Sequence, residues 1–267
     1  MCLLYVGEKR MTEKRMTGMT LALQLYTVRD ETARDFAGTL RRVAEIGYGA
    51  VEFAGYGDLS SDALKGLLAE TGLRAASTHV SLTALEDNLE REIDYCRAID
   101  CSYLVLPWLA PDQRDVDSLR ALAPRLDEFG RRCRAHGITF AYHNHDFEFA
   151  TAEGQRLLDI LLDNTDPDLV ALELDVYWAA YAGVDPVALL QRRAGRVPLV
   201  HLKDMAADRS FTEVGDGTLN LKAIWTAAEK SGARWYIVEN DRPLIPSLQS
   251  ARRSLENART MGISQQP

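Results

Sequence analysis

The sequence predicts a single (β/α)8 barrel, and two observations lead to this fold class. Short apolar runs rich in β-branched residues alternate with longer segments of helical spacing, and this pair recurs roughly every 25 to 35 residues. The length of 267 residues suits one barrel of about 250 residues. Because no linker or change in composition divides the chain, we expect one domain over residues 20–267. Residues 1–19 are expected to be a tail, or a misassigned start, outside it.

Eight strands are expected from the apolar runs: Leu21–Leu25, Ala50–Phe53, Arg74–Thr78, Tyr103–Leu106, Thr139–Tyr142, Val170–Leu174, Pro198–Leu202 and Trp235–Val238. Eight helical segments follow them: Phe36–Ile46, Asp62–Thr71, Leu85–Ile99, Val116–His136, Gln155–Leu162, Pro186–Ala194, Leu221–Ser231 and Ser247–Met261. Strict alternation of this kind implies parallel strands joined by right-handed crossovers. An open, doubly wound sheet is the main alternative. It usually carries a glycine-rich turn after its first strand, and residues 24–29 contain no glycine.

Several residues mark the expected helix ends. Ser61 is expected to cap the second helix, and Asp185 followed by Pro186 has the pattern of a cap and a first-turn proline. A glycine follows four helical segments, where a left-handed residue commonly ends a helix: Gly47, Gly72, Gly137 and Gly232.

Composition narrows the classes of function. The formal net charge of -8 disfavours a surface for duplex nucleic acid, because phosphates repel carboxylates. No apolar run approaches the roughly 20 residues that cross a membrane. The four cysteines form no C-x-x-C pair, which indicates reduced thiols. We therefore expect a cytoplasmic enzyme with a small-molecule substrate and with neither a nucleic-acid nor a membrane partner.

Chemically active side chains gather where the expected strands end. Glu52, Asp175 and Glu239 end the second, sixth and eighth strands. Active sites of such barrels lie at the C-terminal ends of the strands, so the fold would bring remote residues together. Four of the five histidines lie at or just after the ends of the third, fifth and seventh strands: His79, His143, His145 and His201.

A ring of imidazole and carboxylate groups at one barrel mouth has the mixed nitrogen and oxygen character of a divalent-metal site. We expect one ion, Mn²⁺ first, with Co²⁺, Mg²⁺ or Zn²⁺ as alternatives. Each residue also has a plainer interpretation, since Asp175 can cap the following turn and Glu239 can pair with Arg242. Several unpaired charges buried at one mouth would nevertheless be costly without a cation.

Six motifs lie at or beyond these strands: LALQLYTVRD, AYHNHDFEF, LELDVYW, VPLVHLKDM, EVGDGTLN and YIVEND. Together they resemble the xylose-isomerase-like sugar isomerase/epimerase family over residues 20–260. That family includes inosose dehydratases, tagatose 3-epimerases, hydroxypyruvate isomerases and the endonuclease IV group. The pair YHNHDFEF and HLKD is typical of one branch of it.

The resemblance implies a ligand set. In the epimerases of this family a Glu, an Asp, a His and a Glu from strands five to eight hold the metal, which implies Asp175, His201 and Glu239 here. At the fifth strand the sequence departs from the pattern, because His143 stands where those relatives carry glutamate. His143 is therefore the implied ligand, with Glu148 as a nearby substitute. The missing glutamate argues against a symmetric mechanism with two glutamate bases.

The implied chemistry is proton abstraction next to the carbonyl of a sugar or keto-sugar, through a metal-stabilised enediolate. Glu239 is the first choice as base, and Lys203 is placed to stabilise an enolate oxygen unless it pairs with Asp204 or Glu173 instead. The catalytic candidates are Glu239, His145, Lys203 and Glu148. The substrate-binding candidates are Glu52, His79, Trp108, Trp178 and Asp216.

The fate of the abstracted proton separates the candidate functions. The first is a metal-dependent sugar isomerase or epimerase. The second is a keto-sugar or inosose dehydratase, which His143 favours because inosose dehydratases are also rich in histidine at that position. An AP endonuclease-like DNA-repair enzyme and a non-catalytic sugar-binding barrel are remoter alternatives. We expect a substrate without phosphate, since no glycine-rich cradle is present, and a homo-oligomer is compatible with the dimers and tetramers of relatives.

Overall fold

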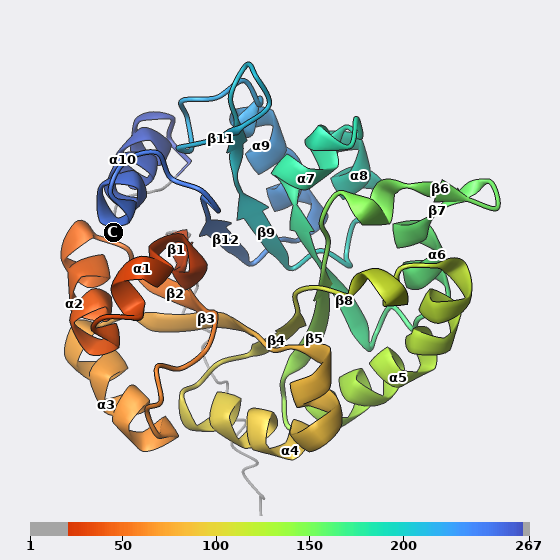
Figure 1. The fold of residues 1–267 in the computed structure, drawn as a ribbon, viewed down its shortest axis with the longest axis horizontal. Coiled ribbons are helices and arrows are strands. Elements are labelled where there is room, and N and C mark those ends of the chain that lie inside the picture. Colours follow the sequence, from red (N-terminus) through yellow and green to blue (C-terminus); the bar gives the residue numbers. More distant parts are fainter. Residues whose placement is uncertain (1–20, 264–267) are drawn as a thin grey trace, which may run out of the picture.

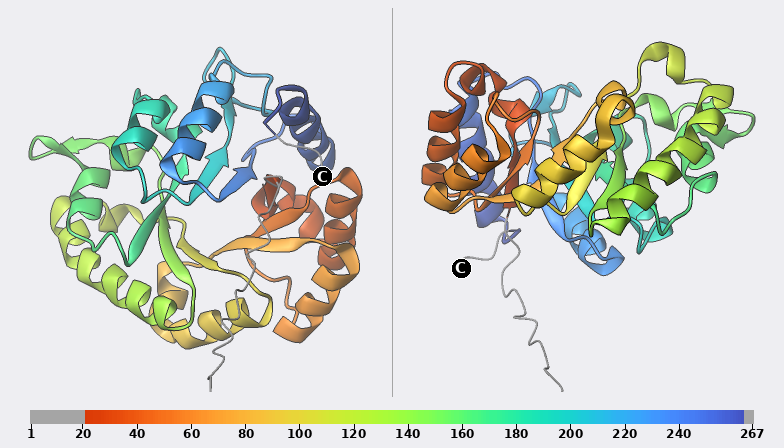
Figure 2. Two further views of the ribbon diagram at one scale, coloured as in Figure 1. Left: turned by 180° about the vertical axis from the view of Figure 1, so that it is seen from behind. Right: turned by 90° about the horizontal axis from the view of Figure 1, so that it is seen from below.

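The computed structural model describes residues 21–263, so the tail expected at residues 1–19 lies outside the described part. Within this range eight parallel strands close into one barrel, and helices surround it (Figure 1). Figure 2 shows the same ring of helices from behind. The predicted (β/α)8 barrel is confirmed.

The barrel strands pair in chain order, and the last strand pairs with the first to close the ring. They are β1 (Leu21–Gln24), β2 (Ala50–Phe53), β3 (Arg74–His79), β4 (Tyr103–Leu106), β5 (Thr139–His143), β8 (Val170–Asp175), β9 (Leu199–Leu202) and β12 (Trp235–Val238). Two antiparallel hairpins, which the periodicity did not predict, complete the strands. They are β6 (Thr151–Ala152) with β7 (Gln155–Arg156), and β10 (Asp204–Met205) with β11 (Phe211–Thr212).

Eight longer helices follow the barrel strands: α2 (Phe36–Ile46), α3 (Ser61–Thr71), α4 (Leu82–Ala98), α5 (Val116–Ala135), α6 (Leu157–Asp163), α8 (Pro186–Arg192), α9 (Leu221–Ser231) and α10 (Ser247–Thr260). Five shorter segments were not predicted: α1 (Arg29–Thr32), α7 (Val176–Tyr181), and the 3-10 turns η1 (Leu25–Val28), η2 (Pro111–Gln113) and η3 (Phe147–Phe149). None of the helices in residues 21–263 combines the length and apolar character that a membrane span requires.

Most of the predicted helix ends are confirmed. Gly47 follows α2 with a φ of 107°, and Asp185 caps α8 by accepting a hydrogen bond from the Val187 amide at 2.9 Å. The cap predicted at Ser61 was wrong. Ser60 has the extended backbone of a cap and accepts from the Ala63 amide at 3.2 Å, so Ser61 is already helical. The helix predicted from Gln155 begins later, because that residue lies in β7.

The interior of the barrel is built in layers along the strands. Each of the eight strands contributes one residue to a separate apolar cluster: Ala22, Ala50, Ala76, Val105, Ala141, Ala171, Leu199 and Ile237. Since side chains alternate between the two faces of a strand, the residues two positions later also point inward. In seven strands that next residue is polar and almost fully buried: Gln24, Glu52, Thr78, His143, Glu173, His201 and Glu239. An apolar floor thus supports a polar layer below the mouth.

Helix α5 packs so closely against the chain entering β8 that it leaves no room for one methyl group. A Cβ atom at Gly130 would lie 2.3 Å from the backbone oxygen of Leu169. We therefore expect Gly130→Ala to destabilise the protein by about 1–3 kcal/mol, despite the better helix propensity of alanine.

Urea unfolding measures this effect, and Gly66 provides the matched control. In α3 a Cβ atom at Gly66 would meet nothing within 4 Å. Gly66→Ala should therefore stabilise the protein by about 0.5–1 kcal/mol. Equal changes in the two variants would contradict the close packing of α5.

Candidate active site

Three imidazoles surround one carboxylate oxygen in the polar layer. His79 Nε2, His143 Nδ1 and His201 Nε2 lie 2.7, 3.0 and 3.3 Å from Glu173 Oε2. Glu52 lies beside this group, with Oε2 at 2.7 Å from His201 Nε2 and 3.2 Å from His79 Nε2. We call His79, His143, Glu173 and His201 the inner group, and their ligand atoms lie close enough to share one metal ion.

A second group lies one step closer to the mouth. It consists of Asp175, His201 and Glu239, whose ligand atoms also lie within 4.8 Å of one another. His201 belongs to both groups: its Nδ1 lies 2.9 Å from Glu239 Oε2, while its Nε2 faces the inner group. We call Asp175, His201 and Glu239 the outer group.

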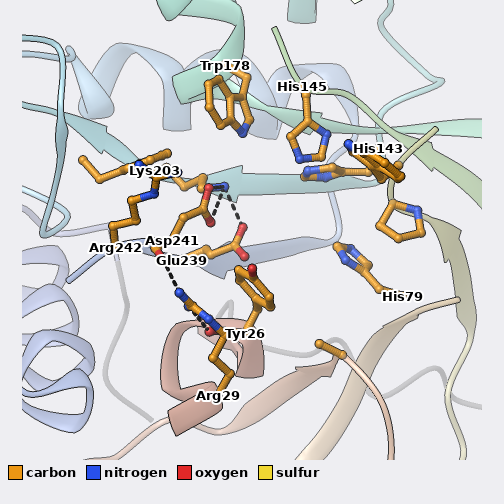
Figure 3. Close-up of a pocket in the computed structure, with 14 residues that line it drawn as sticks. Tyr26, Arg29, His79, His143, His145, Trp178, Lys203, Glu239, Asp241 and Arg242 are labelled. Atoms are coloured by element: carbon orange, nitrogen blue, oxygen red, sulfur yellow. Dashed lines mark hydrogen bonds and ion pairs between the residues drawn. The ribbon is translucent and has the colours of Figure 1, made fainter. Parts of the chain in front are cut away.

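Lys203 places a cation among the outer carboxylates. Its Nζ lies 3.0 Å from Asp175 Oδ2, 2.9 Å from Glu239 Oε2 and 2.9 Å from Asp241 Oδ1. Figure 3 shows the contacts to Glu239 and Asp241 as dashed lines. The alternative partners considered from the sequence, Asp204 and Glu173, are not used. The Asp204 carboxylate instead accepts hydrogen bonds from backbone amides of the 215–219 turn.

Neighbouring charges set the ionisation of these groups. Burial alone would raise the pKa of Glu239 and lower the pKa of Lys203. The attraction between the carboxylates and the ammonium is stronger, so the pKa of Glu239 is lowered and that of Lys203 is raised. Burial, together with the charge of Lys203, lowers the pKa of His145 to about 3. The site therefore combines an ionised glutamate, a charged lysine and a neutral imidazole.

Two buried ligand atoms, one in Asp175 of the outer group and one in the neighbouring His143, make no hydrogen bond. These atoms are His143 Nδ1 and Asp175 Oδ2, although Glu173 Oε2 and Lys203 Nζ respectively lie 3.0 Å from them. The other oxygen of Asp175 accepts the Trp178 amide at 3.0 Å, so the predicted capping role and a ligand role use different atoms. Buried imidazole and carboxylate atoms that make no hydrogen bond and lie beside other possible ligand groups fit a divalent cation with mixed nitrogen and oxygen ligands.

The groups face a pocket of about 660 Å³ at the barrel mouth. His79, His143, His145, Trp178, Lys203 and Glu239 line it, together with residues that the sequence prediction did not include: Tyr26, Arg29, Phe211, Asp241 and Arg242. In Figure 3, His145 and Trp178 lie on one wall, and Tyr26 and Arg29 lie on the opposite one. A pocket of this size accommodates a small ligand such as a sugar.

Trp108 lines the pocket, with 47% of its surface exposed. Three of the other predicted catalytic and substrate-binding residues do not line it. Glu52 is fully buried below the pocket, where it accepts hydrogen bonds from Ser77 Oγ at 2.5 Å and Gln24 Nε2 at 2.6 Å. It therefore supports the histidines rather than facing a ligand directly.

Glu148 and Asp216 point away from the metal-ligand groups. Glu148 accepts hydrogen bonds from the Tyr142 hydroxyl at 2.7 Å and the His145 amide at 2.8 Å, so it fixes the turn that carries His145. Burial raises the pKa of Glu148 to about 8. Asp216 pairs with Arg253 of α10 at 2.5 Å and does not line the pocket.

Comparison with known proteins identifies the family. The xylose isomerase-like TIM barrel family matches residues 40–261. The protein belongs to this family. The sequence resemblance drawn from the six motifs is thereby confirmed.

Relatives of this xylose isomerase-like barrel include two kinds of enzyme. An inosose dehydratase of Geobacillus kaustophilus is 28% identical over 245 residues, which cover 76% of this chain and 79% of the relative. An inosose dehydratase of Lacticaseibacillus casei is 30% identical over 145 residues, about half the length of each protein. A solved sugar phosphate isomerase/epimerase of Parabacteroides distasonis has a TM-score of 0.76 and 26% identity, covering 90% of this chain and 97% of that one.

Sequence reasoning missed Glu173 and Asp241, although a pattern could have found both. Glu173 precedes Asp175 by two residues in β8, and Asp241 follows Glu239 by two residues beyond β12. Glu173 and Asp175 share one face of β8, so Glu173 had to point into the barrel, whereas Asp241 could be found only by its nearness to the end of β12. By contrast, the polar side chains of Arg29 and Tyr26 follow β1 in a 3-10 turn and a short helix, where strand alternation gives no guidance.

Proposed function

We propose that this protein is a metal-dependent lyase that removes a proton next to the carbonyl of a keto-sugar or inosose and then releases water. The proposal rests on one observation: Asp175, His201 and Glu239 gather around Lys203 and His143 beside the mouth pocket. The inosose dehydratases among the relatives support the substrate class and the reaction. The sequence alone favoured the epimerase. Because of these relatives, we now favour the dehydratase.

The outer group is the better metal site for such a reaction. Glu239 lines the pocket, whereas Glu173 of the inner group is fully buried and does not. Asp175, His201 and Glu239 would therefore hold the cation, with His143 beside them, since its Nε2 lies 3.9 Å from Asp175 Oδ2. When bound, the divalent cation would polarise the ketone and stabilise negative charge on its oxygen.

The protein's own groups supply the proton transfers. The ionised Glu239 carboxylate can take the proton from the carbon next to the carbonyl. The electron pair of that C–H bond first forms the C=C bond of the enolate, and as the C=O bond re-forms, that pair makes the new C=C bond to the β-carbon and the C–O bond to the β-hydroxyl breaks. Glu239 can then deliver the same proton to the departing hydroxyl, which leaves as water. Lys203 stays charged and can donate a hydrogen bond to the developing enolate oxygen.

Epimerisation is the second candidate, and His145 is the observation that favours it. This reaction needs a second acid/base on the opposite face of the substrate. His143 supplies no carboxylate there. His145 lines the pocket, so its imidazole can contact a ligand there. A Glu239 and His145 pair could therefore move a proton from one face to the other.

A product assay tests the proposal. We expect the protein with added Mn²⁺ to convert 2-keto-myo-inositol in D₂O to a product that has lost one water, as read by NMR and mass spectrometry. Chelation with EDTA should abolish this activity, and Mn²⁺ should restore it. Deuterium exchange without loss of water would favour the epimerase instead. Full activity after chelation, or no reaction of any keto-sugar or inosose, would overturn the proposal.

A further inference from the structure

A second cavity opens directly beside the mouth pocket. It measures about 330 Å³ and lies between α7, the β10–β11 hairpin and the loop that follows β12. Trp178, Phe211 and Arg242 line both cavities, so the two share one wall. We call this second cavity the side pocket. The two cavities are therefore direct neighbours.

The walls of the side pocket are mainly aromatic. Tyr177 and Phe211 stack with their ring centroids 4.3 Å apart, and Trp178 meets Phe211 edge-on at 5.5 Å. Tyr181 packs edge-on against Trp178, also at 5.5 Å. These contacts fix the rings in place before any ligand binds, which lowers the entropy cost of stacking another ring on them.

Several polar groups that line the side pocket are already used, and the donors without a hydrogen-bond partner in residues 21–263, Trp178 Nε1 and the Arg242 guanidinium, belong to the wall shared with the mouth pocket. The Tyr177 hydroxyl donates to the backbone oxygen of Arg209 at 2.8 Å, and Ser210 Oγ donates to Asp208 at 2.6 Å. Arg209 donates to the backbone oxygen of Tyr181. A second sugar ring would bring several hydroxyls that need partners, whereas a planar apolar ring needs none. The walls therefore suit an aromatic ring better than a carbohydrate.

Exposed apolar surface concentrates around the two cavities. Within residues 21–263, the large hydrophobic side chains with high exposure are Tyr26, Trp108 and Leu244. The first two line the mouth pocket, and Leu244 lines the side pocket with 91% of its surface exposed. The guanidinium of Arg242, which forms no ion pair or hydrogen bond with the described part of the chain, lies at the shared wall. It can cover the face of an aromatic ring.

We propose that the side pocket binds an aromatic ring that the substrate carries on its sugar-like part. The substrate is then an aryl-substituted keto-sugar, whose carbonyl half lies over Glu239 while its ring stacks among Trp178, Tyr181 and Phe211. The sugar half of this assignment rests on the proposed function, but the binding of the ring does not depend on turnover.

Binding of two probes to the Mn²⁺-loaded protein tests this. In isothermal titration calorimetry, 4-nitrophenyl glucoside should bind about tenfold more tightly than methyl glucoside. Leu244→Asp and Tyr181→Ala should each remove most of that advantage while leaving the affinity for methyl glucoside unchanged. Leu244 is so exposed that its substitution should not affect folding, and thermal melting checks this for both variants.

Three results would overturn the proposal. The first is equal affinity for the two probes, and the second is an advantage that neither substitution changes, since the ring would then bind elsewhere. The third is a wild-type dimer that Leu244→Asp converts to a monomer in light scattering, because the apolar surface would then be a subunit interface. If ring-dependent binding persists while no keto-sugar is converted, the aromatic-ring site in the side pocket is supported and the proposed function is contradicted.

Discussion

A Glu239→Gln protein is expected to turn over its substrate about 10²- to 10⁴-fold more slowly than the wild type, even with excess Mn²⁺. The carboxylate lines the pocket, and His201 and Lys203 hold it in its ionised form. An amide cannot accept the proton from carbon, and it is also a weaker metal ligand. Its oxygen can still accept a hydrogen bond from Lys203, so the fold and the lysine position should persist. The rate of water loss, compared between a substrate with hydrogen and one with deuterium at the carbon next to the carbonyl, measures the proton-transfer step.

A buried glutamate outside the pocket provides the control for this substitution. Glu92 on α4 is 7% exposed and accepts a hydrogen bond from the Tyr56 hydroxyl at 3.2 Å. Glu92→Gln should leave the rate of water loss close to that of the wild type. If Glu239→Gln binds metal fully and slows water loss by less than about tenfold, Glu239 is not the base.

The barrel, and the position of its site at the C-terminal ends of the strands, could be predicted because both depend on periodicity. Short apolar strands alternate with helices, and the side chains at strand ends must meet in a closed ring. This reasoning brought His79, His143 and His201 to one place, as the structure shows. This reasoning considered only residues at or after the end of each strand. It therefore overlooked Glu173, which lies two residues before the end of β8.

The positions of loop side chains could not be predicted in the same way. Glu148 lies five residues beyond the end of β5, but the η3 turn folds it back onto the His145 amide instead of toward the metal-ligand groups. Asp216 lies in a turn whose amides bind Asp204, and that turn directs it outward to Arg253. The direction of each of these two side chains depends on local contacts, which strand or helix periodicity does not predict.

Lys203→Met should destabilise the metal-free protein by about 3–5 kcal/mol, because it leaves buried carboxylates without their cation. Lys203 is 1% exposed, and its ammonium lies within 3.0 Å of oxygens of Asp175, Glu239 and Asp241. A metal ion held by Asp175 and Glu239 would replace part of the missing positive charge. Excess Mn²⁺ should therefore stabilise the variant much more than it stabilises the wild type, and the variant should bind Mn²⁺ more tightly.

Urea unfolding with EDTA and with Mn²⁺ measures both effects, and an exposed lysine on α9 is the control. Lys222→Met should change stability by less than about 0.5 kcal/mol under either condition. An equal loss for Lys203→Met with and without Mn²⁺ would mean that the ammonium and the metal do not share carboxylates, which would remove Asp175 and Glu239 from the metal site. Tighter Mn²⁺ binding together with a slower reaction is the combined outcome expected of a lysine that competes with the metal for ligands and also acts on the substrate.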